Sequence, residues 1–152
     1  MIDEETDGIL KIADIHAARL QEALDDLARK YPFDKNFIEH MEKIDLLTLE
    51  MMTNRFAKLQ DLLGKKVIDL FLQNQAQPVD GLFMLDKIHL LEKFNIIESD
   101  EVWDQLRETR NHITHEYPDN PDLAARHSNG IFATSQQLIV IYQTLAAAIR
   151  QG

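Results

Sequence analysis

Apolar residues recur along the chain at intervals of three and four positions, the spacing that places them on one face of an α-helix. This spacing predicts a first helix over about 6–30 and a long second helix over about 34–75. A short helix is expected over about 82–94, a fourth over about 101–116 and a last over about 120–150. No stretch of useful length alternates apolar and polar residues, so no β-strand is expected.

Residues that start and stop helices fall between these segments. Asp34 is expected to cap the second helix. Asn120 followed by Pro121 predicts the N-cap and the first residue of the last helix. Tyr31–Pro32 ends the first helix, because a residue before proline avoids the α conformation. Gly64 lies inside the second helix at a propensity cost of about 1 kcal/mol, which indicates close approach of another helix there.

These elements predict an all-α fold: an antiparallel four- to five-helix bundle. No domain linker, repeat or low-complexity tract interrupts the 152 residues, so a single domain is expected over residues 1–152. The chain has no cysteine, which excludes disulfides and thiolate metal sites and favours a reducing compartment. The acidic N-terminus resembles no signal or transit peptide, and no apolar run is long enough to span a membrane. We therefore expect a cytoplasmic protein without membrane contact.

The net charge of −10 bears on possible partners. Residues 1–50 carry 13 acidic and 6 basic residues, so most of the excess acid is N-terminal. Neutralisation of phosphates by basic side chains supplies most non-specific affinity for nucleic acids. An RNA-binding role for this chain therefore needs a localised site or the help of a partner.

The fourth predicted helix contains one polar residue where its pattern calls for an apolar one. Its stripe of alternating three- and four-residue steps passes through Trp103, Leu106, Ile113 and Tyr117, and Arg110 interrupts it. A half-buried guanidinium is costly unless it is paired. A break of this kind in a local pattern often marks a functional site.

Further polar residues lie along one edge of the same stripe. Arg107, Asn111 and His115 follow one another at steps of four, next to Arg110, so the four side chains are expected to line one groove. Histidine exchanges a proton near neutral pH, and arginine offers a planar fork to phosphate oxygens. Together they can deprotonate a ribose 2′-OH and stabilise the charge that develops on the phosphate, without a metal.

The segment Arg110-Asn111-His112-Ile113-Thr114-His115 resembles the motif of the HEPN superfamily, an Arg followed by Asn, with His after four intervening residues. Tyr117 extends the match to the Arg-x4-His-x-Tyr form of the HepT-like toxins, which belong to HEPN/MNT toxin–antitoxin pairs. Residues 55–64 also resemble the central helix of that family, so the resemblance covers roughly residues 40–150.

This resemblance implies a helical bundle of HEPN type that forms a homodimer, with two motifs facing each other in one composite site. It implies a metal-independent endoribonuclease, without a cofactor, that cleaves tRNA or another RNA by attack of the 2′-OH. His115 is then the general base or acid and Arg110 holds the scissile phosphate, while Asn111 orients one of them and Arg107 adds charge. The implied partner is an MNT-type nucleotidyltransferase antitoxin, which can modify Tyr117 with AMP.

Other interpretations of the same residues stay open. The chain can be a non-catalytic HEPN subunit that binds a nucleotidyltransferase, an alternative suggested by its acidic first third. It can also be a plain scaffold, in which Arg110 pairs with a carboxylate that is sealed from solvent. His112, His115 and Glu116 raise the possibility of a metal site, but the sequence offers no convincing further ligand, so no metal is expected.

Overall fold

The computed structural model describes residues 2–113, 117 and 119–152. Within these residues every regular element is helical. The elements are α1 (Glu4–Leu27), α2 (Lys35–Glu39), α3 (Lys43–Leu62), the π-helical turn η1 (Leu63–Val67), α4 (Ile68–Asn74), α5 (Met84–Lys93), α6 (Asp100–Ile113) and α7 (Pro121–Gln151). The predicted all-α class is therefore confirmed.

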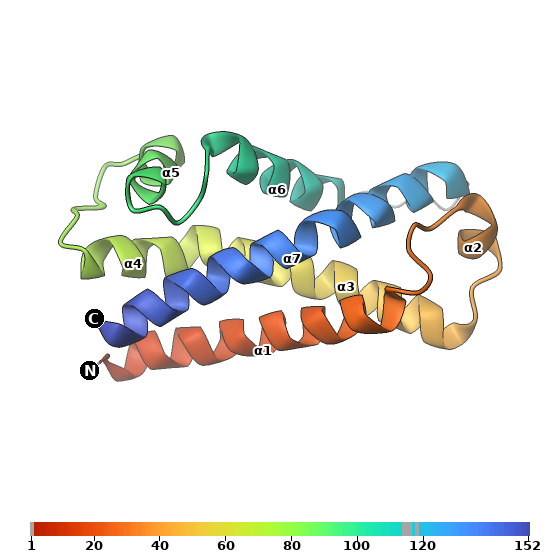
Figure 1. Cartoon of the computed structure of the whole chain (residues 1–152), viewed down its shortest axis with the longest axis horizontal. Coiled ribbons are helices and arrows are strands. Elements are labelled where there is room, and N and C mark those ends of the chain that lie inside the picture. Colours follow the sequence, from red (N-terminus) through yellow and green to blue (C-terminus); the bar gives the residue numbers. More distant parts are fainter. Residues whose placement is uncertain (1, 114–116, 118) are drawn as a thin grey trace.

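Three long helical stretches run along the molecule, and the shorter α6 lies beside two of them (Figure 1). In the view of Figure 1 the chain runs from left to right in α1 and returns from right to left through α3, η1 and α4. It then runs from left to right in α6 and from right to left in α7. Neighbours that follow one another in this path are antiparallel, as predicted for a bundle. The short helices α2 and α5 lie near the two ends, and both chain termini lie at the same end.

The helix starts show why the local sequence predicts them well. The Asp34 carboxylate accepts a hydrogen bond from the Phe37 N–H at 2.8 Å, and the Asn120 side chain accepts one from the Leu123 N–H at 3.1 Å. Both side chains cap their helices as expected. Asp3 does the same for α1 by accepting from Thr6, and this hydrogen bond lowers the pKa of Asp3 below its ordinary value.

The predicted second helix is wrong as a single element. His40 ends α2, and α3 begins only after Glu42, which has an extended backbone. The chain contains neither proline nor glycine between positions 33 and 63, so no local signal announces this break. Tertiary packing accounts for it, because the Phe37 ring stacks against Phe33 and α2 contacts the first part of α7.

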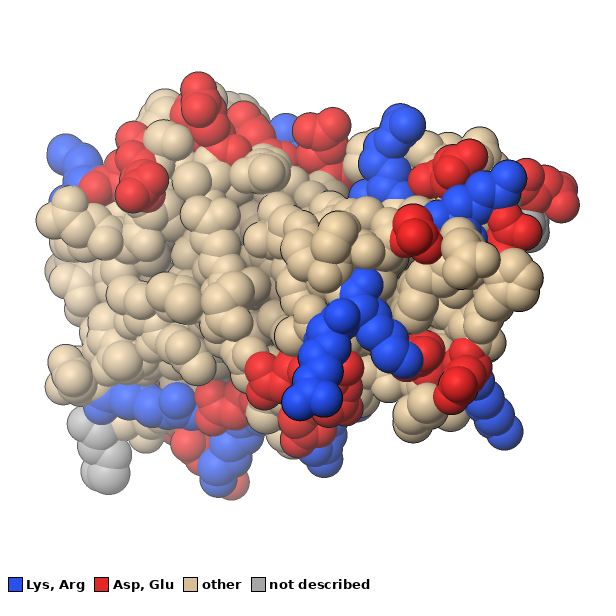
Figure 2. Space-filling model, turned by 45° about the vertical axis from the view of Figure 1, so that its right-hand side comes forward, with Lys and Arg blue, Asp and Glu red and all other residues tan. Residues whose placement is uncertain are grey.

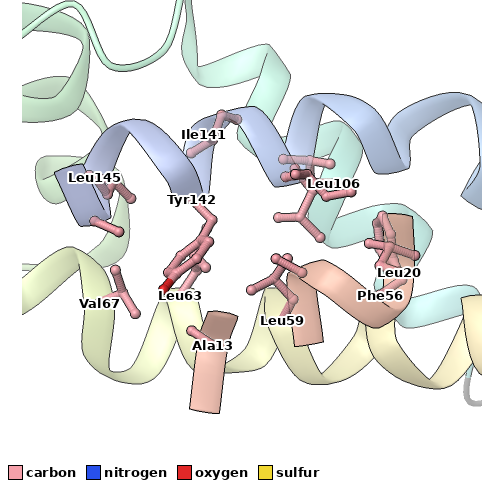
Figure 3. Close-up of a cluster of buried hydrophobic side chains, with 14 of the residues drawn as sticks. Ala13, Leu20, Phe56, Leu59, Leu63, Val67, Leu106, Ile141, Tyr142 and Leu145 are labelled. Carbon is pink, nitrogen blue, oxygen red and sulfur yellow. The ribbon is translucent and has the colours of Figure 1, made fainter. Parts of the chain in front are cut away.

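The core lies between α1, α3 with its continuation, α6 and α7. Figure 3 shows side chains from all four converging on one volume, with Leu20, Leu59, Leu106 and Leu145 among them. Each of these four leucines is fully buried. The core is shared by segments far apart in sequence, so no single helix buries its apolar face alone.

Small residues decide which face of α1 is buried. Ala13 and Ala17 face the core, whereas the larger and more hydrophobic Ile12 and Ile15 are exposed. The alanines occupy the 3–4 spacing that leads to Leu20, and their small side chains let the neighbouring helices come close. Size and spacing outweigh hydrophobicity on this helix.

Gly64 faces Trp103, a buried residue of α6, and belongs to η1, the π-helical turn between α3 and α4. A Cβ atom at Gly64 would lie 3.6 Å from Cζ2 of Trp103, which is an ordinary van der Waals distance. Another helix therefore packs at Gly64, as its sequence position predicts, but the packing does not require glycine there.

A buried polar group ties the end of α7 to α1. The Tyr142 hydroxyl lies 2.6 Å from Oδ1 of Asp14 and 2.9 Å from the Leu10 carbonyl oxygen, and Arg150 donates to the other carboxylate oxygen at 2.7 Å. Burial, followed by the hydrogen bond to Asp14, raises the pKa of Tyr142 above its ordinary value. The hydroxyl therefore stays protonated and can donate across the physiological pH range.

Charge is unevenly distributed over the surface. Residues 127–149 of α7 contain no Asp, Glu, Lys or Arg, although the whole chain is 28% charged. Figure 2 shows a face with a broad area without charged side chains and with acidic and basic groups gathered along its edges. None of the described helices is both long and apolar enough to cross a membrane.

Tyr142→Phe tests the contribution of the buried hydroxyl. The substitution keeps the ring but leaves the Leu10 carbonyl and Asp14 without this donor, so we expect a loss of ~1–3 kcal/mol in unfolding free energy. Chemical denaturation measures it. Tyr31→Phe is the matched control because the Tyr31 ring stacks on Phe132 at 4.2 Å and remains in place. Equal stability of both variants and the wild type would show that the Tyr142 hydroxyl contributes nothing.

Candidate functional site

The candidate site is built on α6, whose position is set by its buried residues. Trp103 and Leu106 anchor the helix in the core, and Ile113 packs against it one turn beyond Arg110. The apolar stripe predicted from the sequence is thus the buried face of α6. Arg110 lies on the edge of that face, where the sequence pattern calls for an apolar side chain.

Arg110 is held by a carboxylate of the central helix. Its Nε donates to Oδ1 of Asp61 at 2.9 Å, and its NH2 group donates to Oδ2 at 3.0 Å. This two-point arrangement fixes the plane of the guanidinium as well as its position. The hydrogen bonds to Asp61 are the main cause that raises the pKa of Arg110 above its ordinary value, so the group stays positively charged.

This ion pair is not sealed from solvent. The Arg110 side chain is 24% exposed and that of Asp61 is 39% exposed. The scaffold interpretation predicts a carboxylate partner for Arg110, and Asp61 is that partner. It also predicts that the pair is sealed from solvent, and the pair is not sealed. Arg110 is therefore oriented by Asp61 while part of it remains accessible.

An open groove of about 420 Å³ is bordered by Arg110 and lies between α6 and the middle of α3. Its lining combines apolar and polar groups from the two helices: Leu49, Glu50, Thr53, Asn54, Ala57, Arg110 and Ile113. Thr53 and Asn54 offer neutral hydrogen-bonding groups there, although the Thr53 hydroxyl already donates to the Leu49 carbonyl oxygen. A ligand in this groove would meet mainly apolar walls, together with the Arg110 guanidinium and the Glu50 carboxylate.

The predicted residues do not all line this groove. Arg107 lies 3.4 Å from Asp104 and borders a different groove, between α5 and α6. The expectation that Arg107 and Arg110 share one groove therefore does not match their positions. Asn111 is exposed near the end of α6 and has an interaction within the protein. His115 lies outside the described residues.

A second group of aromatic and basic residues lies on the other side of α6, facing α7. The rings of His112 and His127 are 4.5 Å apart in an edge-to-face arrangement, and the ring of Tyr117 lies 4.8 Å from that of His127. A groove of about 200 Å³ runs beside them, with Arg126 and Gly130 in its lining. The candidate modification site Tyr117 thus has a basic, aromatic surrounding.

Sequence reasoning missed His127, which looks like an isolated surface residue. No motif connects it to the Arg110 segment, because its contacts with His112 and Tyr117 come from the packing of α7 against α6. Its place in the first turns of α7, the helix that follows the motif, is the one sequence signal that could have indicated it. Of the three residues weighed as a metal site, His115 and Glu116 lie outside the described residues.

Comparisons of this chain with protein-family models, with curated proteins and with solved structures found no match.

Asp61→Asn tests the ion pair. The substitution keeps the shape of the side chain but removes the charge that compensates Arg110, so we expect a loss of about 1–2 kcal/mol in unfolding free energy, reduced by the partial exposure of the pair. Asp104→Asn removes the charge of the exposed Arg107 pair and should change stability by less than about 0.5 kcal/mol. Thermal and chemical unfolding compare the two. Equal effects of both variants would show that Arg110 depends on Asp61 no more than Arg107 depends on Asp104.

Proposed function

We propose that the chain is a metal-independent endoribonuclease of HEPN type, a HepT-like toxin that acts as a homodimer in the cytoplasm. The observation that supports it most is the state of Arg110. The guanidinium is charged, oriented by Asp61 and partly exposed at the border of an open groove. A phosphate-binding arginine has these properties, because orientation before the ligand arrives lowers the entropic cost of binding.

The proposed reaction uses one histidine and one arginine from each motif. His115 accepts the proton of a ribose 2′-OH, and the 2′ oxygen attacks the adjacent phosphorus. The bond from phosphorus to the 5′ oxygen breaks, and that oxygen takes a proton from the histidine of the second motif, which acts as the general acid. The products are a 2′,3′-cyclic phosphate and a 5′-OH. Arg110 stabilises the charge that develops on the phosphate oxygens, and Asn111 orients one of the two groups.

The acidity of the chain opposes RNA binding, and Glu50 and Asp61 place two carboxylates at this site, but most of the excess acid lies elsewhere. Its largest excess lies within residues 1–50, most of which belong to α1 and the segments next to it. Figure 1 places α1 across the bundle from α6, the helix that carries Arg110. The uncharged stretch of α7 also supports the homodimer, since two acidic copies can meet there with little repulsion.

Substitution of the motif tests the proposed catalysis. We expect Arg110→Ala and His115→Ala to lower the rate of RNA cleavage by about 10²- to 10⁴-fold and to abolish growth arrest on expression, as expected for loss of acid–base and charge stabilisation. Cleavage of total RNA and of tRNA by the purified protein is followed on denaturing gels. Circular dichroism checks that the variants fold.

Arg107→Ala is the matched control, because Arg107 lies on α6 like Arg110 but borders another groove. It should cleave RNA at close to the wild-type rate. Wild-type cleavage by both motif variants would exclude this assignment. Equal loss in Arg107→Ala and Arg110→Ala would indicate a general effect of positive charge on α6 in place of a specific role of Arg110.

A non-catalytic HEPN subunit of a nucleotidyltransferase pair is the second candidate. Its support is electrostatic, because Arg107 and Arg110 both lie against carboxylates and residues 1–50 carry a balance of −7. An acidic α1 suits a basic protein partner better than it suits RNA. The partner of that pair is an MNT-type nucleotidyltransferase.

Co-expression with a nucleotidyltransferase encoded next to this chain separates the two candidates. The toxin predicts growth arrest by the chain alone and relief by the partner, whereas the binding subunit predicts a stable complex and no growth arrest. Intact-mass measurement detects addition of AMP, and Tyr117→Phe should abolish it while Tyr31→Phe should not. AMP on the Tyr117→Phe variant would place the modification elsewhere.

A further inference from the structure

Three side chains with metal-binding groups meet where α5 ends and α6 begins. His89 and Glu92 lie three residues apart on α5, so they project from the same face of that helix. Asp100 is the first residue of α6. The imidazole nitrogen and the two carboxylate oxygens all lie within 4.8 Å of one another, and Nε2 of His89 is 3.7 Å from Oδ2 of Asp100.

This spacing is close to that of a metal centre. Ligand atoms at about 2.0–2.2 Å from a zinc ion lie about 3.4 Å apart when they are arranged tetrahedrally. The His89–Asp100 separation of 3.7 Å is already near this value. The Glu92 oxygen lies within 4.8 Å of the other two ligand atoms, and its flexible side chain would have to bring it closer to complete the centre.

We propose that His89, Glu92 and Asp100 bind a divalent transition-metal ion of the zinc class, with water completing the coordination. One nitrogen and two carboxylate oxygens form a ligand set that such ions accept, whereas Mg²⁺ and Ca²⁺ favour oxygen ligands alone. The two carboxylates carry a charge of −2, which a divalent cation neutralises. The proposed site is independent of the proposed ribonuclease activity.

The electrostatic surroundings favour a cation. Beyond the ligands, Glu98 and Glu101 add negative charge, whereas Asp104 is paired with Arg107, and Lys93 at the end of α5 is the other basic residue nearby in sequence. The side chains of His89 and Asp100 are 53% and 42% exposed, so an ion reaches them from solvent without opening of the fold. Among the described residues, no other group of three such side chains comes together in this way.

A metal at this position would act as a cross-link between two helices. α5 is joined to α4 by the Lys87–Asp69 ion pair at 2.8 Å and by the contact of Phe94 with Phe71. The proposed ion adds a direct link from α5 to α6 across the loop that connects them. Asp100 lies ten residues from Arg110, about 15 Å along α6, so the ion stabilises the helix and takes no part in chemistry at Arg110.

Titration of the full-length protein with ZnCl₂ tests the site after removal of trace metal with a chelating resin. We expect one zinc ion per chain by calorimetry, an increase in the melting temperature, and visible absorption bands typical of low-coordinate Co²⁺ when CoCl₂ replaces ZnCl₂. His89→Gln and Asp100→Asn should each weaken binding by at least about tenfold and abolish the stabilisation. MgCl₂ should produce none of these effects.

His112→Gln is the matched control, because Nε2 of His112 lies 3.8 Å from Glu108 and its ring contacts that of His127, yet the described residues bring no three ligand atoms together there. It should bind zinc like the wild type. Absence of zinc binding by the wild type, unchanged binding by both ligand variants, or a loss confined to His112→Gln would each overturn the proposal. RNA cleavage plays no part in these measurements, so either proposal can fail without the other.

Discussion

Burial of apolar side chains between α1, the α3–α4 stretch, α6 and α7 is the constraint on which the rest of the structure depends. The chain has no disulfide, and its helices are held together by a core to which all four segments contribute. Each fully buried leucine contributes about 1.5–3 kcal/mol relative to an exposed one, which exceeds the contribution of any surface ion pair on the molecule. This core determines where α6 lies, through Trp103 and Leu106, and so determines where Arg110 can reach.

Within that frame, the pairing of Arg110 with Asp61 decides what the surface of α6 can offer a ligand. A carboxylate so close lowers the net charge of the site and weakens its attraction for a distant phosphate. The same carboxylate holds the guanidinium in one plane, so less conformational freedom is lost when a ligand binds. The Asp61 carboxylate thus weakens the attraction of Arg110 for a distant phosphate and, in return, holds its guanidinium in a fixed orientation. Such a site is better suited to completion by a second protein copy than to binding nucleic acid alone.

The sequence predicts those features whose causes are local. Asp34 and Asn120 are recognisable as caps because a capping side chain bonds to a backbone N–H three residues away. Asp61 could not be identified as the partner of Arg110, since 49 residues separate them and several carboxylates were equally plausible. The contact of His127 with His112 could not be predicted for the same reason, because it arises from the packing of α7 against α6. The break after α2 carries no glycine or proline, so only packing on α7 explains it.

The π-helical turn η1 gives one continuous helix two different sets of neighbours. Hydrogen bonds that span five residues instead of four accommodate one additional residue in the turn. One residue corresponds to a rotation of about 100° around a helix axis. α3 contacts α1, α6 and α7, whereas α4 contacts α5 and α7, so the two parts share α7 and differ in their other neighbours. The number of residues in η1, as well as their types, therefore determines which face of α4 points towards its neighbours. Insertion or deletion of one residue at η1 would rotate the whole of α4, and with it the contact of α4 with α5, away from the faces that they now cover.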